Sequence, residues 1–116
     1  MLSVTYSFNF SATHHIPKGS QFESLEHSRL YRLEVEISGM VLDNMKIIDP
    51  KKVKEIVKQE VINNYDDKNL NEMFEIPTVE VLLSQVAMDL KRKLKNLTKV
   101  ILHESDELRA TATYVL

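Results

Sequence analysis

The sequence contains no cysteine and no tryptophan, only two glycines and three prolines, and no long apolar run. The absence of cysteine excludes disulfides, thiolate metal ligands and a cysteine nucleophile. No segment approaches the ~18 consecutive apolar residues of a membrane-spanning helix, and the alternating start MLSVTYSFNF lacks the basic residues of a signal peptide. A net charge of −2 gives no electrostatic case for binding nucleic acid or a membrane. We therefore expect a cytoplasmic protein with neither kind of partner.

The remaining composition fits a single ordered domain over residues 1–116. Hydrophobic residues make up 43% of the chain and charged residues 28%, a balance typical of globular proteins rather than of disordered or fibrous ones. A domain of this size buries roughly 65% of the surface that its unfolded chain exposes. It can therefore fold alone, and association with further copies would add to its stability.

Apolar and polar residues alternate in two long segments, which predicts two half-buried strands. The first segment alternates from Val4 to His14, and the second, over about 30–42, continues an alternation that starts at His27. Two shorter strands are expected at about 99–104 and 108–115, with the sequence SDE in the turn between them.

Two helices are expected between the second and third strands. Asp49 followed by Pro50 is typical of a helix start, and Thr78 caps a second helix whose apolar stripe extends to Leu97. The segment 63–77 between the helices is predicted to be a polar loop. The order strand–strand–helix–helix–strand–strand predicts an α+β fold, a four-stranded antiparallel sheet with both helices packed on one face.

One face of the second strand begins with His27 and Arg29 before it becomes apolar. A buried arginine is costly unless something pairs with it, so either the strand begins outside the core or these side chains line a site. If the two long strands form a hairpin, His14 meets both residues at one end of the sheet. Two histidines on adjacent strands are two-thirds of a three-imidazole zinc site, but a guanidinium has no lone pair to offer as third ligand.

Six motifs in order along the chain resemble those of the 6-pyruvoyltetrahydropterin synthase and 6-carboxytetrahydropterin synthase family. They are FSATHHI, HSRLYRLEVEISG, MKIIDPKKVK, YDDKNLN, IPTVEVL and VILHES, and together they span essentially the whole chain. The resemblance implies the tetrahydropterin-synthase-like T-fold, a pterin-type ligand and a zinc cofactor. It also implies trimers that pair into hexamers, with active sites between subunits.

The resemblance implies a metal and catalytic site in which three groups are altered. The family's first two zinc histidines correspond to His14 and His27, but the third position holds Arg29, which leaves the metal site incomplete. The catalytic cysteine corresponds to Glu23 and the catalytic histidine to Asp67. Some family members carry glutamate at the cysteine position, so Glu23 is a candidate acid or base.

Four further residues correspond to functional positions. Asp66 falls on the family's catalytic aspartate, and Glu104 falls on the glutamate that grips the pterin ring. A carboxylate can accept two parallel N–H bonds from such a ring. Thr78 and Glu80 lie in the motif next to the ring, although helix capping and first-turn dipole compensation explain both residues without a ligand.

Arg29 has two interpretations on the sequence alone. Its guanidinium either replaces the metal as a cation paired with Glu23, Glu26 or Asp67, or it simply reaches solvent. The adjacent acids Asp66 and Asp67 are either ordinary loop residues or a pair that can share a proton in a pocket.

The histidines also have alternatives. His14 and His27 are ordinary polar residues at strand ends, a weakened metal site, or a metal-free polar cluster where the metal once was. His15 points to the opposite face from His14, and we expect it in solvent.

Three functions stay open. The first is a pterin-binding protein in which the loss of three chemical groups argues against zinc-dependent lyase activity. The second is an active carbon–oxygen lyase on dihydroneopterin triphosphate, with Glu23 or Asp67 as acid or base. The third is a non-catalytic assembly partner of an active paralogue.

Overall fold

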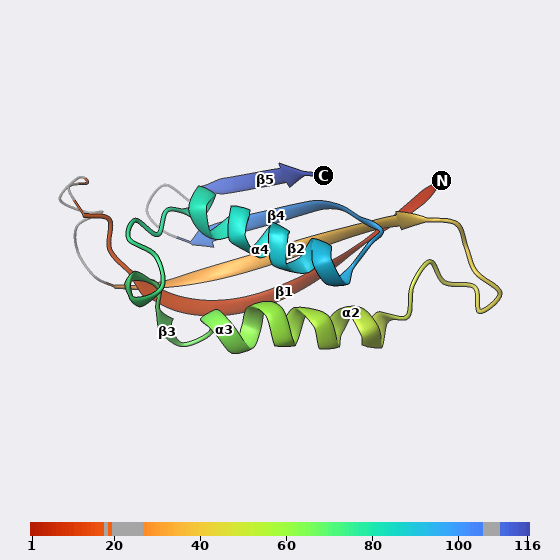
Figure 1. Cartoon of the computed structure of the whole chain (residues 1–116), viewed down its shortest axis with the longest axis horizontal. Helices are drawn as coiled ribbons and strands as arrows, with labels where there is room; N and C mark the ends of the chain where they lie inside the picture. The colour runs from red at the N-terminus through yellow and green to blue at the C-terminus, as the bar shows by residue number, and fades with distance from the viewer. Residues whose placement is uncertain (18, 20–26, 106–109) are drawn as a thin grey trace.

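The computed structural model describes residues 1–17, 19, 27–105 and 110–116 (Figure 1). These residues contain five strands in one sheet, in the spatial order β3-β1-β2-β4-β5. The strands are β1 (Leu2–His14), β2 (His27–Gly39), β3 (Lys68–Asn69), β4 (Leu97–Ser105) and β5 (Thr111–Val115). The four longer strands pair antiparallel, and β3 pairs parallel with β1.

Two long helical segments lie between β2 and β4. The first segment comprises α2 (Pro50–Val57), the π-helix η1 (Lys58–Ile62) and α3 (Asn63–Tyr65), and the second is α4 (Val79–Lys93). The short 3-10 helix η2 (Leu70–Glu72) follows β3. The side chains of Asp49 and Thr78 cap α2 and α4 by accepting backbone N–H bonds from the first turn. No helix in the described part of the chain is long and apolar enough to cross a membrane.

The core lies between the sheet and the helices, which pack against one of its faces (Figure 1). Every second residue of β2 from Arg29 to Ile37 is buried, because successive side chains of a strand point to opposite faces. The buried set on β2 comprises Arg29, Tyr31, Leu33, Val35 and Ile37. The same alternation in β1 and β4 buries His14 and Glu104, so two further polar side chains share the core face.

The predicted α+β fold, with a mainly antiparallel sheet and two helices, is confirmed. Three details differ from the prediction. The sheet has a fifth, two-residue strand, β3; β2 ends at Gly39 rather than near residue 42; and α4 ends at Lys93. Leu94 and Leu97 are both buried, but Leu97 is the first residue of β4. Apolar spacing alone therefore did not reveal where this helix stops.

The segment 63–77 is not the polar loop that we predicted. It contains α3, β3 and η2. Two of its side chains, Tyr65 and Leu70, lie in the core and are 5% and 0% exposed. These two apolar residues are five positions apart in a polar sequence, so they produce no helical or strand periodicity. Hydrogen bonds to residues far away in the sequence, such as those between Asp66, Asp67 and Ser11, fix the position of this segment.

Candidate functional site

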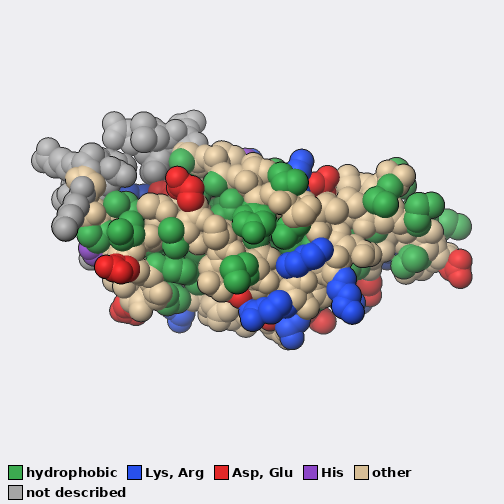
Figure 2. Space-filling view, turned by 45° about the horizontal axis from the view of Figure 1, so that its top comes forward, with side chains coloured by type: hydrophobic (Ala, Val, Ile, Leu, Met, Phe, Trp, Pro, Cys, Tyr) green, Lys and Arg blue, Asp and Glu red, His purple; other side chains and the backbone are tan. Residues whose placement is uncertain are grey.

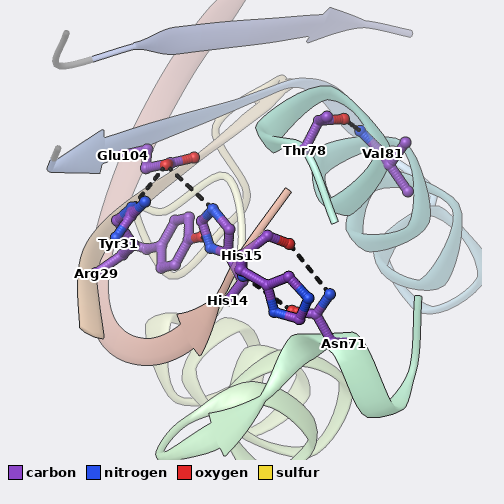
Figure 3. Close-up of polar contacts among 8 residues, drawn as sticks. All are labelled: His14, His15, Arg29, Tyr31, Asn71, Thr78, Val81 and Glu104. Atoms are coloured by element: carbon purple, nitrogen blue, oxygen red, sulfur yellow. Dashed lines mark hydrogen bonds and ion pairs between the residues drawn. The ribbon is translucent and has the colours of Figure 1, made fainter. Parts of the chain in front are cut away.

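Four polar residues meet on the helix-covered face, at the end of the sheet where β1 ends, β2 begins and β4 ends (Figure 3). They are His14, Arg29, Tyr31 and Glu104, which we call the buried network. The strand register explains the meeting, because Ala12 pairs with Arg29 and Tyr31 pairs with Glu104. Arg29 is 2% exposed and Glu104 is 6% exposed, so both charged groups lie in the interior of the chain.

The contacts of the buried network form a chain from arginine to tyrosine. Arg29 Nε donates to Glu104 Oε1 at 3.3 Å, and His14 Nε2 lies 3.6 Å from the same oxygen. The other ring nitrogen, His14 Nδ1, lies 2.9 Å from the Tyr31 hydroxyl. The Tyr31 ring stacks on Phe10 with 5.0 Å between ring centroids. Because a buried charge is stable only when it is paired, the ion pair accounts for the position of Arg29 in the core.

The alternative that Arg29 reaches solvent is wrong, because the residue is almost fully buried. Glu104 is a carboxylate partner that we did not predict for it. Of the carboxylates that we did predict, Asp67 is exposed, and Glu23 and Glu26 lie outside the described residues. The pairing of Arg29 with Glu104 could have been predicted from the alternation of buried residues in β4 and from the pairing of β4 with β2, since both place Glu104 on the same face of the sheet as Arg29.

His27 begins β2, and its backbone pairs with His14 in the strand register. Its side chain lies outside the part of the chain that the structure describes. Glu23, the residue at the family's cysteine position, lies outside it as well. Their roles in the metal and catalytic site therefore stay predictions.

Asp66 and Asp67 lie at the edge of the sheet beside Ser11. Asp66 Oδ1 accepts a hydrogen bond from Ser11 N at 3.0 Å, and Asp67 N donates to Ser11 O at 2.7 Å. Asp67 has a φ of 58°, in the left-handed region that aspartate tolerates better than most residues. Both side chains are exposed, so these hydrogen bonds attach a turn to β1 and do not form a buried proton-sharing pair.

Thr78 and Glu80 lie at the start of α4. Thr78 Oγ1 accepts a hydrogen bond from Val81 N at 3.2 Å, so the predicted capping role is confirmed (Figure 3). Glu80 is exposed in the first turn, where a negative charge complements the helix dipole. The described contacts of both residues are explained by the helix alone.

The backbone of His15, just after β1, forms two hydrogen bonds with the side chain of Asn71. His15 N donates to Asn71 Oδ1 at 2.9 Å, and Asn71 Nδ2 donates to His15 O at 3.1 Å, so the side-chain amide acts like a strand partner (Figure 3). The expectation that His15 lies in solvent holds only in part, because the residue is half-buried. Nδ1 is buried and has no hydrogen-bond partner among the described residues.

A second charged cluster lies on the face of the sheet that the helices leave open. It comprises Arg32, Glu34, His103 and Thr111, which we call the open-face cluster. His103 Nε2 lies 2.7 Å from Glu34 Oε1, and His103 Nδ1 lies 3.1 Å from Thr111 Oγ1. A hollow of about 920 Å³ is lined by Arg32, His103 and Thr111 together with Asp66 and Glu104. Most of its lining belongs to the open face, so the hollow does not mark the buried network itself.

The described residues do not fit the zinc ion that the family resemblance implies. They contain no group of three or more histidine, cysteine, aspartate or glutamate side chains placed to hold a metal. At the position of the third ligand, Arg29 offers a cation without a lone pair.

Comparison with known proteins gives the chain its family. The family model of 6-pyruvoyl tetrahydropterin synthase matches residues 3–114. A provisionally named 6-carboxy-5,6,7,8-tetrahydropterin synthase of Archaeoglobus fulgidus is 37% identical over 104 residues, which are 90% of this chain and 89% of that protein. The Caenorhabditis elegans 6-pyruvoyl tetrahydropterin synthase structure has a TM-score of 0.82 at 24% identity, covering 99% of this chain and 95% of that one.

Two Plasmodium enzymes extend the likeness of fold. The Plasmodium falciparum 6-pyruvoyl tetrahydropterin synthase has a TM-score of 0.66 at 16% identity, covering 98% of this chain and 99% of that one. The Plasmodium vivax enzyme, with a catalytic glutamate replaced by cysteine, has a TM-score of 0.63 at 12% identity, covering 99% and 98%. On the strength of the family model and the Archaeoglobus relative, the chain belongs to the 6-pyruvoyl tetrahydropterin synthase family.

Proposed function

We propose that this chain binds a pterin-type ligand and that Glu104 recognises the ring. The observation that carries the proposal is the placement of Glu104, a carboxylate held inside the chain by Arg29 and His14. The Archaeoglobus relative, named for a tetrahydropterin product, supports the ligand class. Zinc-dependent lyase chemistry is not part of this proposal, because the described donors do not fit the ion.

Glu104 has the chemistry that recognition of a pterin requires. An ionised carboxylate only accepts hydrogen bonds, and its two oxygens can accept from the ring N3–H and the exocyclic amine together. The adjacent Arg29 guanidinium favours the ionised form. Arg29 and His14 both contact Oε1, and these contacts hold that oxygen in place.

The test is the quenching of neopterin fluorescence by the wild type and by Glu104→Gln. Glu104→Gln keeps the shape but replaces one acceptor with a donor, and we expect an affinity loss of about 10- to 100-fold, the size of a charge-assisted bond. Glu34→Gln is the matched control, because Glu34 also contacts an arginine and a histidine but on the open face. Equal binding by the wild type and Glu104→Gln would refute the role of Glu104.

A second candidate is a pterin carbon–oxygen lyase. The Plasmodium vivax relative uses a glutamate as a catalytic residue, which supports Glu23 as acid or base, with Asp66 and Asp67 as further candidates. The assay is turnover of dihydroneopterin triphosphate by the wild type, Glu23→Gln and Asp67→Asn. Turnover that falls in either variant favours this candidate, and no turnover by any of the three proteins eliminates it.

We also propose that the chain forms a homo-oligomer, a trimer or a hexamer. Among the described residues, β1 pairs with β3 only at Ala12 and Thr13, which leaves most of its outer edge available to another chain. Apolar side chains are also exposed at the end of the molecule away from the site, on the segment 40–45 (Figure 2). Light scattering should give three or six times the 13.5 kDa chain mass, and a monomer mass would refute the proposal.

A further inference from the structure

We infer that Arg29 takes the place of a divalent metal in this site, and that the buried network excludes zinc. The inference concerns the metal alone, so it stands or falls independently of pterin binding. Three features of the network carry it: the proton position on His14, the charge of Arg29, and the place of Arg29 on the strand.

The groups that face the two ring nitrogens of His14 indicate which nitrogen carries the proton. Nε2 faces Glu104 Oε1 at 3.6 Å, and Nδ1 faces the Tyr31 hydroxyl at 2.9 Å. A carboxylate oxygen only accepts, so we assign the proton to Nε2, and the Tyr31 hydroxyl then donates to Nδ1. A metal can bind Nε2 only by displacing its proton, and the Arg29 guanidinium, which contacts the same Glu104 oxygen, repels the incoming cation.

The charge of Arg29 opposes a metal from the same place. A guanidinium stays cationic in proteins and has no lone pair, so it cannot become a ligand. Both Arg29 and Glu104 are at least nine-tenths buried, and little water is available to screen a divalent cation from the guanidinium. The guanidinium already compensates the negative charge of Glu104, which removes the electrostatic reason for a metal to enter.

The place of Arg29 on β2 makes the exchange specific. The backbone of His27 pairs with that of His14, and Arg29, two residues further along β2, is buried on the same face of the sheet as His14. By the family resemblance, a histidine at this position would join His14 and His27 in a three-histidine site of the open, catalytic kind. The chain instead presents a permanent cation there, so a single residue separates the metal-free site from a metal-binding one.

The test is the zinc content of untagged protein, purified without chelator, loaded with zinc and freed of excess by gel filtration. Elemental mass spectrometry should find less than about 0.1 zinc per wild-type chain and close to one per Arg29→His chain, a gain of roughly tenfold. Arg92→His is the control, because Arg92 lies exposed on α4 away from the network and should give the wild-type value.

Two results would overturn the inference. One is about one zinc per wild-type chain that disappears in His14→Gln, because the ion would then be held by the network. The other is a folded Arg29→His protein that binds no more zinc than the wild type, because Arg29 would then not be what excludes the metal. The wild-type measurement needs no variant, so it decides the main point even if Arg29→His fails to fold.

Discussion

Two arginines three residues apart on β2 make nearly the same ion pair in opposite surroundings. Arg29 Nε lies 3.3 Å from Glu104 Oε1, and Arg32 Nη2 lies 3.4 Å from Glu34 Oε1. A histidine also contacts each carboxylate: His14 contacts Glu104 in the buried network, and His103 contacts Glu34 in the open-face cluster. Arg29 is 2% exposed and Arg32 is 55% exposed. Distance therefore does not distinguish the two pairs; their access to water does.

The difference shows why one pair is a candidate site and the other is a surface feature. Exposed ion pairs contribute about 0–1 kcal/mol, because water and salt screen the charges. A buried pair must offset the loss of hydration of both charges, so removing one partner leaves a costly charge in the core. A buried charge pair that costs hydration energy needs an explanation beyond stability, and the ligand recognition that we propose for Glu104 supplies one.

The largest difference in stability should appear between variants that remove Arg29 and Arg32. Arg29→Met should lower the free energy of unfolding by about 3–5 kcal/mol, because Glu104 is left in the core without its cation. Arg32→Met should lower it by less than about 1 kcal/mol. Urea denaturation followed by circular dichroism measures both. Equal losses would show that burial does not separate the two pairs.

The double variant Arg29→Met/Glu104→Leu is the internal control for this prediction. Replacing both charges with apolar side chains removes the uncompensated carboxylate, so much of the loss should be recovered. A double variant that is as unstable as the sum of its two single variants would mean that Arg29 and Glu104 do not interact.

A second buried group extends the comparison to pH. Burial, with added repulsion from Asp89 and Glu60, raises the pKa of Tyr65 from 10.0 to about 12. The stabilisation from the protonated phenol is complete below pH 10 and is lost as the pH rises toward 12, because the unfolded chain ionises first. The loss should reach roughly 3 kcal/mol. Unfolding measured from pH 9 to 12 should show it, and Tyr65→Phe should remove that part of the pH dependence.

The hydrogen bonds to His14 and His103 should differ less in their contribution to the free energy of unfolding. Tyr31→Phe removes the hydroxyl that contacts His14 Nδ1 in the core, and should cost about 1–2 kcal/mol. Thr111→Val removes the hydroxyl that contacts His103 Nδ1 on the open face, where water can replace it, and should cost less than about 0.5 kcal/mol. Thermal unfolding compares the two variants. A larger loss for Thr111→Val would reverse the comparison.

The smallest expected difference is in how salt changes the coupling energies of the two ion pairs. Raising the ionic strength from about 0.05 to 0.5 M should reduce the coupling energy between Arg32 and Glu34 toward zero, because both are accessible to ions. The coupling between Arg29 and Glu104 should change little over the same range. Double-mutant cycles at the two salt concentrations measure both couplings, and a parallel fall in both would show that salt reaches the buried network.

The fold could be predicted from the sequence because its strands and helices carry clear periodicity. The alternation in β1 and β2 is enough to place His14 and Arg29 on one face, and Thr78 marks the start of α4. The pairing of Arg29 with Glu104 joins residues 75 positions apart, and it depends on which strands are neighbours. Local pattern does not contain that information.

Two other features escaped prediction for related reasons. Tyr65 and Leu70 are core residues in a segment that is otherwise polar, so only the packed structure reveals them. The Asn71 side chain bonds the backbone of His15, and its position follows from where η2 meets β1 rather than from a motif. Such contacts form between segments that the sequence places more than 50 residues apart.

The most direct test of a metal-free buried network is the protonation of His14, read by long-range proton–nitrogen NMR with and without zinc. The spectrum of Tyr31→Phe identifies the ring, because this variant changes the Nδ1 environment. We predict a ring protonated at Nε2, with Nδ1 accepting a hydrogen bond, and no change when zinc is added. A ring protonated at Nδ1, with an Nε2 resonance that shifts on addition of zinc, would contradict the account.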